Sequence, residues 1–328
     1  MFPNWIIAGA PKAGTSSLFR WLRDHPDVTG PLEKETYYFV DPGTHMFPSR
    51  RNFYQDGLAG YSKLFDCCDR SSKIIIESTP GYVYSRTALR ELPALPSAPR
   101  FIFVLREPVA QLRSLFTYFQ QNWNWIPRDM SFAEFVAAAE TGSHEFKGNE
   151  LAANALHNVW YPEHLRRWRD AVGSERMFIL LFEDLIGDTA QTMERVSTWM
   201  GIDPSFYTDY DFEPENQTYL ARNGALQDLN VLIRGRLPQG PVYNAVRRLY
   251  RAINTKKPPR QSEDTQVEGR LAARYAGMLP ELEKDYGLDL ASWRRGRTGS
   301  SAGAVPCASS FQGFRTPETE FPADLAAE

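Results

Sequence analysis

The chain has 328 residues, 42% of them hydrophobic and 13% aromatic, with a formal net charge of -3. This composition is typical of a globular protein with a packed core, and the lack of a basic excess argues against a nucleic-acid partner. The three cysteines include an adjacent pair, a pattern that fits neither a disulfide framework nor a zinc site. The first residues resemble neither a signal peptide nor a membrane anchor, so we expect a cytoplasmic protein without a membrane span.

The first predicted elements are a buried strand, a glycine-bracketed loop and a helix. The apolar run at 5–9 leads into "GAPKAGTSSL", and apolar residues then recur at helical spacing until Pro26. Gly9 and Gly14 would turn the chain so that backbone N–H groups and the helix start face an anion. Lys12 lies inside this turn, within reach of a phosphate oxygen. A tight turn with an incidental lysine is the alternative interpretation.

The loop "GAPKAGTSSL" resembles the 5′-phosphosulfate-binding loop of sulfotransferases that use 3′-phosphoadenosine-5′-phosphosulfate (PAPS). The resemblance implies that the cofactor contacts include Lys12, Ala13, Gly14, Thr15, Ser16 and Ser17. A nucleotide-hydrolysing P-loop would carry its lysine directly after the second glycine and a metal-binding aspartate after a later strand. Here Thr15 stands at that lysine position, and the later strands end in "IIIEST" and "FVLREP". The loop therefore favours a single phosphate carrying a sulfuryl group.

Residues 31–42, "PLEKETYYFVDP", resemble the Lys-Glu-x-x-[FY]-F segment of heparan-type glycan sulfotransferases, whose glutamate is the catalytic base. Sulfuryl transfer needs such a base for the attacking hydroxyl or amine. The resemblance implies that Glu35 is this base, and the predicted catalytic set is Glu35, Lys12 and Lys34. Glu33 is an alternative carboxylate, and an ordinary charged loop is the alternative interpretation of the segment.

The second predicted strand covers residues 73–77, and the overlapping segment 74–84 resembles the family's Glu-Lys-[ST]-Pro-x-Tyr motif. Ser78 stands where this motif has lysine, which leaves Lys12 as the main cation of the site. Sulfotransferases of phenols and steroids place a histidine base in a Lys-[ST]-His segment near this point. None of the five histidines, His45 among them, lies in such a segment, so we interpret all five as surface or packing residues.

A third strand is predicted at 101–105, followed by a helix with apolar residues at helical spacing. The segment 101–119 resembles the family's 3′-phosphate-binding element, a strand with an arginine at its end and a serine eight residues later. This implies that Arg106 and Ser114 hold the 3′-phosphate, and a guanidinium suits that ligand because it gives two charged hydrogen bonds. A surface ion pair is the alternative role of Arg106. The loop at 120–130 holds two tryptophans that could line the acceptor site or pack on the sheet.

Two further helix starts and a fourth strand continue the alternation. Ser131 and Asp188 each precede by three residues a Glu or Gln, the spacing of a helix N-terminal cap, and Gly201 is the expected end of the second helix. The strand is predicted at 177–182. Residues 160–188 resemble the family's helix, strand and Glu-Asp-Leu turn, which supports the fold without adding chemistry.

The C-terminal third carries weaker motifs. "YLARNGAL" resembles the family's Arg-Lys-Gly loop that closes over the 3′-phosphate, which implies that Arg222 and Gly224 join the cofactor site. Residues 221–260 contain nine Lys or Arg and one acid, which indicates either a local anion site or a solvated face. A helix or a broken pair of helices is predicted at 269–293, and residues 296–328 are predicted to be a mostly disordered tail.

The alternation of strands and helices predicts one α/β domain over residues 1–295, with a central parallel sheet covered by helices on both faces. The resemblance implies a P-loop-NTPase-like sulfotransferase fold and a PAPS-dependent enzyme without a metal. Such an enzyme moves a sulfuryl group to a hydroxyl of a glycan or small-molecule acceptor; an amine is the second, less favoured interpretation of the acceptor group. Two alternatives stay open: a P-loop kinase or nucleotide hydrolase that needs Mg²⁺, and a non-catalytic nucleotide-binding protein. The sequence assigns neither the individual acceptor nor an oligomeric state.

Overall fold

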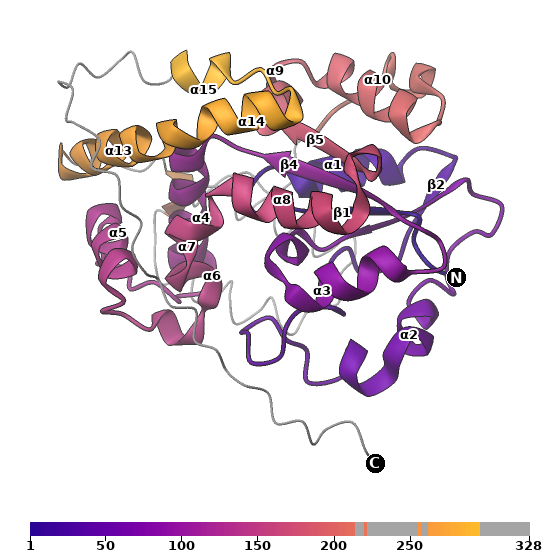
Figure 1. The fold of residues 1–328 in the computed structure, drawn as a ribbon, viewed down its shortest axis with the longest axis horizontal. Coiled ribbons are helices and arrows are strands. Elements are labelled where there is room, and N and C mark those ends of the chain that lie inside the picture. Colours follow the sequence, from indigo (N-terminus) through magenta and orange to yellow (C-terminus); the bar gives the residue numbers. More distant parts are fainter. Residues whose placement is uncertain (214–219, 222–254, 257–261, 296–328) are drawn as a thin grey trace.

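The computed structural model describes residues 1–213, 220–221, 255–256 and 262–295. Within these ranges the chain forms an open sheet whose neighbouring strands are all parallel, in the order β2, β3, β1, β4 and β5 (Figure 1). The strand bounds are Trp5–Gly9 for β1, Val28–Thr29 for β2, Ile74–Ser78 for β3, Arg100–Leu105 for β4 and Met177–Leu181 for β5. A separate antiparallel ladder pairs β6 (Leu220–Ala221) with β7 (Thr255–Lys256).

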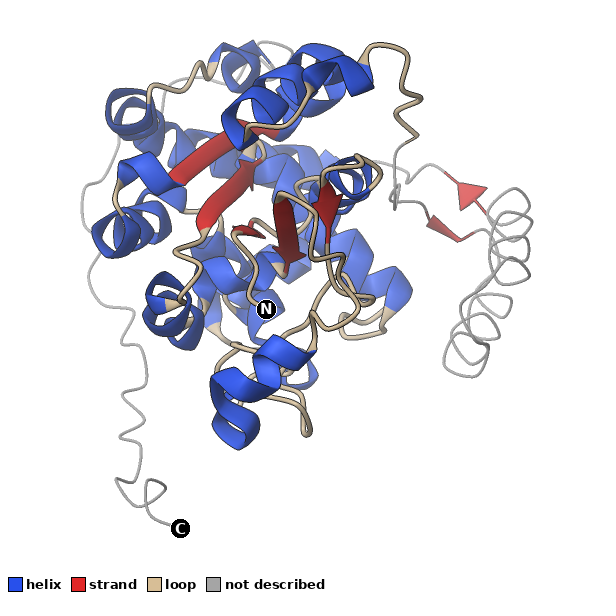
Figure 2. Cartoon of the chain, turned by 90° about the vertical axis from the view of Figure 1, so that its right-hand side faces the viewer, coloured by secondary structure: helices blue, strands red, loops and turns tan. Residues whose placement is uncertain are grey.

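The central strands are buried because their side chains alternate between two cores. In β1, Ile6 and Ala8 belong to one core, whereas Trp5 and Ile7 belong to the other, and β4 alternates in the same way. Continuous apolar runs of this kind are expected where helices cover both faces of a parallel sheet. Figure 2 shows the strands between two layers of helices.

The larger core lies on the face to which Ile6 points, and Trp168 of α8 is buried in its centre. The indole N–H of Trp168 donates to the carbonyl of Val83 at 3.2 Å, which satisfies its polar atom inside the core. The helices on this side are α2 (Phe53–Lys63), α3 (Arg86–Glu91), α4 (Pro108–Asn122), α5 (Phe132–Thr141), α6 (Glu150–Ala153), α7 (Ala155–Asn158), α8 (Tyr161–Val172), α13 (Ser262–Tyr275), α14 (Leu279–Tyr286) and α15 (Ala291–Arg295). None of the helices in the described ranges is both long and apolar enough to span a membrane.

The smaller core is covered by α1 (Thr15–Arg23), α9 (Phe182–Gly187) and α10 (Thr189–Met200). The side chain of Asp188 caps α10 by accepting from the N–H of Gln191, and Gly201 ends this helix with a φ of 73°. Ser131 and Glu134 form a reciprocal capping box at the start of α5. These boundaries confirm the predicted helix starts and the predicted helix end.

The architecture confirms the predicted α/β sheet with helices on both faces, and it differs from the prediction at β2, in the C-terminal helical region, and in elements that were not predicted, among them α2 and the β6–β7 ladder. The short strand β2 was not predicted, because its two residues follow Pro26 and Asp27 without an apolar run. The C-terminal helical region begins at Ser262, earlier than predicted, and breaks into α13, α14 and α15; Gly287 ends α14 with a φ of 64°. The predicted tail, 296–328, lies outside the described residues.

The strand order determines which edge of the sheet can hold a ligand. β1 lies between β3 and β4, so the chain adds strands first on one side of β1 and then on the other. In open α/β sheets, ligands bind beyond the carboxyl ends of the strands at such a switch point. The loops after β1, β3, β4 and β5 all leave the sheet at this edge because the strands are parallel.

Candidate active site

A cavity of about 800 Å³ opens at this carboxyl edge, a volume that suits a ligand of nucleotide size. Its walls come from the loop after β1, the first turn of α1, residues 35–46, the second half of α4 and α9. We call the part formed by Lys12, residues 14–17, Arg106 and Ser114 the cationic end. We call the part formed by Tyr37, His45, Tyr118, Trp123 and Trp125 the aromatic end.

The loop after β1 and the start of α1 are shaped to receive an anion. Gly14 is the N-cap of α1 with a φ of 84°, and a Cβ at this position would lie 2.8 Å from the Phe182 ring. Glycine alone combines this backbone angle with this close packing. No side chain caps α1, and the backbone N–H groups of Thr15 and Ser16 donate to no described residue. These N–H groups and the positive end of the helix dipole are therefore available to an anion.

Lys12 extends from this loop into the cavity. Its Nζ lies 3.9 Å from the centroid of the Tyr118 ring, and its backbone carbonyl accepts a hydrogen bond from Arg106. Burial lowers the pKa of Lys12 to about 8; the charge of Arg106 adds to this shift and that of Glu35 opposes it. Lys12 is therefore a cation at neutral pH that deprotonates more easily than a surface lysine.

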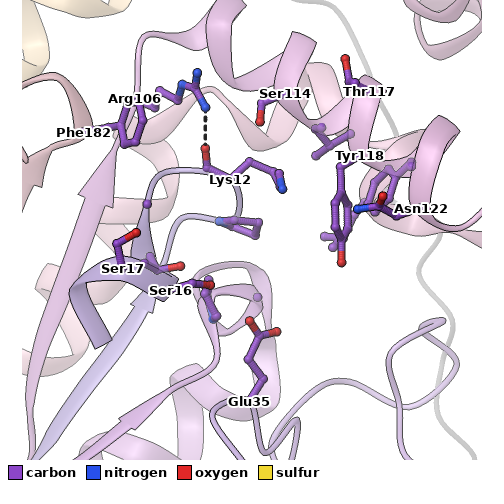
Figure 3. A pocket seen from close by; sticks show the side chains of 18 of the residues that line it. Lys12, Ser16, Ser17, Glu35, Arg106, Ser114, Thr117, Tyr118, Asn122 and Phe182 are labelled. Carbon is purple, nitrogen blue, oxygen red and sulfur yellow. Dashed lines mark hydrogen bonds between the residues drawn. The ribbon is translucent and has the colours of Figure 1, made fainter. Parts of the chain in front are cut away.

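Arg106 follows β4 directly, and the register of the sheet brings it beside Phe182. Leu105 pairs with Leu181 in the β4–β5 ladder, so the residues that follow them leave the sheet side by side. The guanidinium carbon of Arg106 lies 4.4 Å from the Phe182 ring centroid, and its Nη1 donates to the Lys12 carbonyl at 3.0 Å (Figure 3). Its Nε is buried and has no hydrogen-bond partner among the described residues. Arg106 therefore holds the loop and retains a donor for an anion.

Glu35 lies where the two ends of the cavity meet. Its Oε1 accepts a hydrogen bond from Lys34 Nζ at 2.8 Å, and its Oε2 accepts one from the hydroxyl of Tyr37. In Figure 3 its carboxylate points into the open space toward which Lys12 also extends. Burial, reinforced by the charge of Glu35, raises the pKa of Tyr37, so the tyrosine stays protonated and remains a donor.

The segment that carries Glu35 is fixed to the end of β3 through Thr36. The Thr36 hydroxyl donates to Glu77 Oε1 at 3.0 Å, and the Thr36 N–H donates to Thr79 Oγ1 at 3.0 Å. The Thr79 hydroxyl donates in turn to Glu77 Oε1 at 2.6 Å. Complete burial raises the pKa of Glu77 to about 7, although hydrogen bonds from Thr79 and Thr36 oppose the shift. The backbone beside Glu35 is thus anchored on a buried polar network.

Most of the predicted site residues meet in this one cavity. Those that line it are Lys12, Gly14, Thr15, Ser16, Ser17, Glu35, Arg106 and Ser114. Two others do not line it: the side chain of Ala13 is buried in the smaller core, and Lys34 is ion-paired with Glu35. Arg222 and Gly224 lie outside the described residues.

The alternatives to these residues lie elsewhere in the structure. Glu33 is exposed and faces Arg51, with 3.6 Å between the charged atoms, and it does not line the cavity. Ser78, at the motif position where the family has lysine, is fully buried and does not line the cavity either. Glu35 is therefore the carboxylate that reaches the cavity from the predicted acceptor segment, and β3 adds no cation there.

Comparison with known proteins shows that this chain is similar to sulfotransferases. The sequence pattern of the sulfotransferase family matches residues 48–207, a range that includes Arg106 and Ser114. Heparan sulfate glucosamine 3-O-sulfotransferase 6 of Homo sapiens is 27% identical over 203 residues, which are 61% of this chain and 53% of that protein. The chain is therefore similar to sulfotransferases over residues 48–207.

Other sulfotransferases share parts of the sequence and the fold. Bifunctional heparan sulfate N-deacetylase/N-sulfotransferase 1 of Mus musculus is 23% identical over 218 residues, which are 65% of this chain and 24% of that protein. The chain thus spans about half, or about a quarter, of the length of these two curated relatives. The crystal structure of a sulfotransferase from Alicyclobacillus acidocaldarius matches at a TM-score of 0.60 and 22% identity, over 90% of this chain and 100% of that one. That match shows a common fold.

Several side chains that shape this site were missed from the sequence. Tyr118 lies on α4 next to positions that we predicted as core, and its ring supports the lysine of the loop. Gln111 Nε2 donates to the carbonyl of Pro11 at 2.7 Å and so fixes the same loop. His45 packs against Trp125, as a packing residue would, and it also lines the cavity. The one available signal was Gln111, a polar residue on the apolar side of a predicted helix.

Proposed function

We propose that this chain is a PAPS-dependent sulfotransferase that transfers a sulfuryl group to a hydroxyl of a glycan or small-molecule acceptor. The observation that carries the proposal is the placement of Lys12, Arg106 and the free N–H groups of α1 in one cavity with Glu35. This arrangement supplies positive charge for an anionic group in transfer and a base for the attacking hydroxyl. The match of residues 48–207 to the sulfotransferase family supports the same reaction.

The cationic end supports a donor that carries two separate phosphates. The N–H groups of Thr15 and Ser16 would bind the 5′-phosphate, and Lys12 would reach its sulfated oxygen. Arg106, whose Nε has no partner among the described residues, and Ser114 on α4 would bind the 3′-phosphate. A metal-bound triphosphate fits less well, because a threonine follows Gly14 where a nucleotide hydrolase has its lysine.

The transfer step follows from these positions. The acceptor oxygen attacks the sulfur while Glu35 takes the hydroxyl proton, so a new S–O bond forms to the acceptor. The S–O bond to the 5′-phosphate breaks, and its electron pair leaves on the phosphate oxygen. Lys12 and the α1 N–H groups stabilise that charge. The products are the sulfated acceptor and 3′-phosphoadenosine-5′-phosphate (PAP), and Glu35 later returns its proton to solvent.

Two observations bear on the acceptor class. The names of the two relatives above identify heparan sulfate as what they act on, which supports a glycan hydroxyl as one class. The cavity of about 800 Å³ also has room for a small molecule beside the donor. With either a glycan or a small-molecule acceptor, Glu35 would be the base. The cationic end would bind the donor in the same way in both cases.

Calorimetric titration with PAP, and separately with ATP plus Mg²⁺, tests this proposal. We expect PAP to bind more tightly than ATP, and Arg106→Ala to weaken PAP binding by about tenfold or more, since a lost charged hydrogen bond costs about 1.5–3 kcal/mol. Arg100→Ala is the matched control, because Arg100 lies at the opposite end of the same strand and does not line the cavity. Tighter binding of ATP, or PAP binding that Arg106→Ala leaves intact, would contradict the proposal.

A further inference from the structure

The aromatic end of the cavity contains a stacked pair of tryptophans directly after α4. Trp123 and Trp125 both line the cavity, and their rings are nearly parallel, with 9° between the planes and 5.2 Å between the centroids. Asn124, between them, has a φ of 53°, and its Oδ1 accepts a hydrogen bond from Arg128 at 3.2 Å. Of the two possibilities that the sequence left for these tryptophans, the structure therefore favours lining the cavity over packing on the sheet.

The tryptophan pair is packed against neighbouring rings through Trp125. The Trp125 ring meets the rings of His45 and Phe119 edge-on, at centroid distances of 4.7 and 5.2 Å. His45 is fixed in turn by Glu150, whose Oε2 lies 2.6 Å from His45 Nδ1 and 2.9 Å from its backbone nitrogen. Trp123 nevertheless keeps 49% of its surface exposed. A large ring that is rigidly backed and open on one side is a preformed stacking surface, so little ordering entropy is lost when a ligand binds.

The positive charges of the cavity lie on one side of the tryptophan pair. The lysine and arginine side chains that line the cavity among the described residues are Lys12 and Arg106, and Lys12 Nζ lies 3.9 Å from the ring centroid of Tyr118, where the two ends meet. The aromatic end adds Met46, Leu151 and the amide of Asn122. A polyanionic glycan is recognised by several cationic side chains, which the described lining of this end lacks.

Two polar groups of the aromatic end are already engaged. His45 Nδ1 is bound to Glu150 and the Tyr37 hydroxyl donates to Glu35, whereas His45 Nε2 is buried and has no hydrogen-bond partner among the described residues. A sugar ring carries several hydroxyl groups, and each one that loses water without gaining a partner costs affinity. An acceptor with few polar groups and a flat ring avoids that cost and gains contact with the tryptophan pair.

We infer that the acceptor is an uncharged molecule with an aromatic ring system, which packs against the Trp123–Trp125 pair while its hydroxyl meets Glu35. This inference rests on the proposed function and narrows it. It separates this chain from the relatives named for heparan sulfate, whose acceptor is a charged polysaccharide. The ring contacts would set the affinity for the acceptor, and the cationic end would set the affinity for the donor.

Three acceptors distinguish this inference from its rivals, each incubated with the full chain and PAPS and followed by mass spectrometry. Umbelliferone is flat and aromatic with one hydroxyl, a heparan sulfate oligosaccharide is polyanionic, and cellobiose is an uncharged sugar. We expect kcat/KM for umbelliferone to exceed that for either carbohydrate by about tenfold or more, the factor that stacking on aromatic rings supplies. A preference for either carbohydrate would overturn the inference.

Single substitutions test whether the Trp123 ring contacts the acceptor. We expect Trp123→Ala to raise the KM for umbelliferone about tenfold while kcat and PAP affinity change less than about threefold, because the ring contributes to acceptor binding alone. Tyr54→Ala is the matched control: Tyr54 on α2 is 50% exposed and does not line the cavity. An unchanged KM in Trp123→Ala would overturn the inference.

PAP calorimetry on the same preparation separates the two proposals. If PAP binds and umbelliferone is neither bound nor sulfated, this inference fails and the proposed function stands. If PAP itself does not bind, the proposed function fails and this inference fails with it. Sulfation of umbelliferone that depends on Trp123 supports both.

Discussion

The two ends of the cavity are built in different ways. The cationic end uses the backbone of one loop, the N-terminus of α1 and an arginine that directly follows the neighbouring strand. The aromatic end uses ring side chains from residues 37–45, from α4 and from the loop after it. The first is positioned by the register of the sheet, and the second by contacts between side chains that are far apart in the chain.

This difference indicates which parts of the site depend on the side chains of the surrounding loops and which parts do not. Backbone N–H groups and residues at strand ends do not depend on which side chains occupy the surrounding loops. A wall of ring contacts can be rebuilt by substitution without disturbing the sheet. We therefore expect substitutions at the cationic end to affect the donor and the transfer step, and substitutions at the aromatic end to affect the acceptor.

The largest effect is expected at Glu35, where the two ends meet. Glu35→Gln keeps the shape of the side chain but cannot accept a proton, so kcat should fall about 10³-fold, within the range for loss of a general base. Release of PAP from PAPS in the presence of an acceptor measures this rate. Glu33→Gln is the matched control, because Glu33 is exposed and does not line the cavity. Full activity in Glu35→Gln would show that the base is another residue.

Glu77 tests the anchoring of the acceptor segment. Its pKa is about 7 in the folded protein and 4.5 for an unperturbed glutamate, so between these values the folded state binds the proton more tightly than the unfolded state. Stability should therefore fall as pH rises from about 4.5 to 7, by an amount on the order of 2–3 kcal/mol. Glu77→Gln should remove this dependence, as urea unfolding at both ends of the window would measure. If the free energy of unfolding changes with pH by the same amount in the unmodified chain and in Glu77→Gln, Glu77 is not the cause of the pH dependence.

Lys12 gives the cationic end its own pH dependence. Its pKa of about 8 means that the ammonium loses its proton as pH rises through this value, and with it the charge that faces the donor. We expect kcat/KM for PAPS to fall about tenfold for each pH unit above that point. Lys12→Arg keeps its charge and should lose the alkaline decline, whatever its absolute rate. If the decline persists in that variant, another group causes it.

The smallest effect is expected at Tyr37, which we interpret as a positioning residue for Glu35. Tyr37→Phe removes one of the two hydrogen bonds to the carboxylate, so kcat should fall about threefold while the KM for PAPS stays the same. Steady-state kinetics with varied PAPS would show this division. A rise in the KM for PAPS without a change in kcat would place Tyr37 at the donor instead.

The sequence predicted the cationic end better than the aromatic end for a physical reason. Strands β1, β3, β4 and β5 are apolar runs, and the Lys12 loop and Arg106 directly follow two of them, so local patterns locate them. Glu35 was found because it belongs to a contiguous segment. The partners of Trp125, by contrast, come from positions 45 and 119, and only the folded chain brings them together. Arg222 and Gly224 lie outside the described residues and stay a prediction.

The most direct test of the separation between the cationic end and the aromatic end is calorimetric titration of PAP into the full chain, Lys12→Met and Glu35→Gln. We predict that Lys12→Met weakens PAP binding about tenfold or more, since it removes a charged contact to the donor phosphate. Glu35→Gln should bind PAP within about twofold of the unmodified chain, because its carboxylate acts on the acceptor. Equal losses in the two variants, or no loss in Lys12→Met, would contradict the separation of the cavity into a donor-binding cationic end and an acceptor-binding aromatic end.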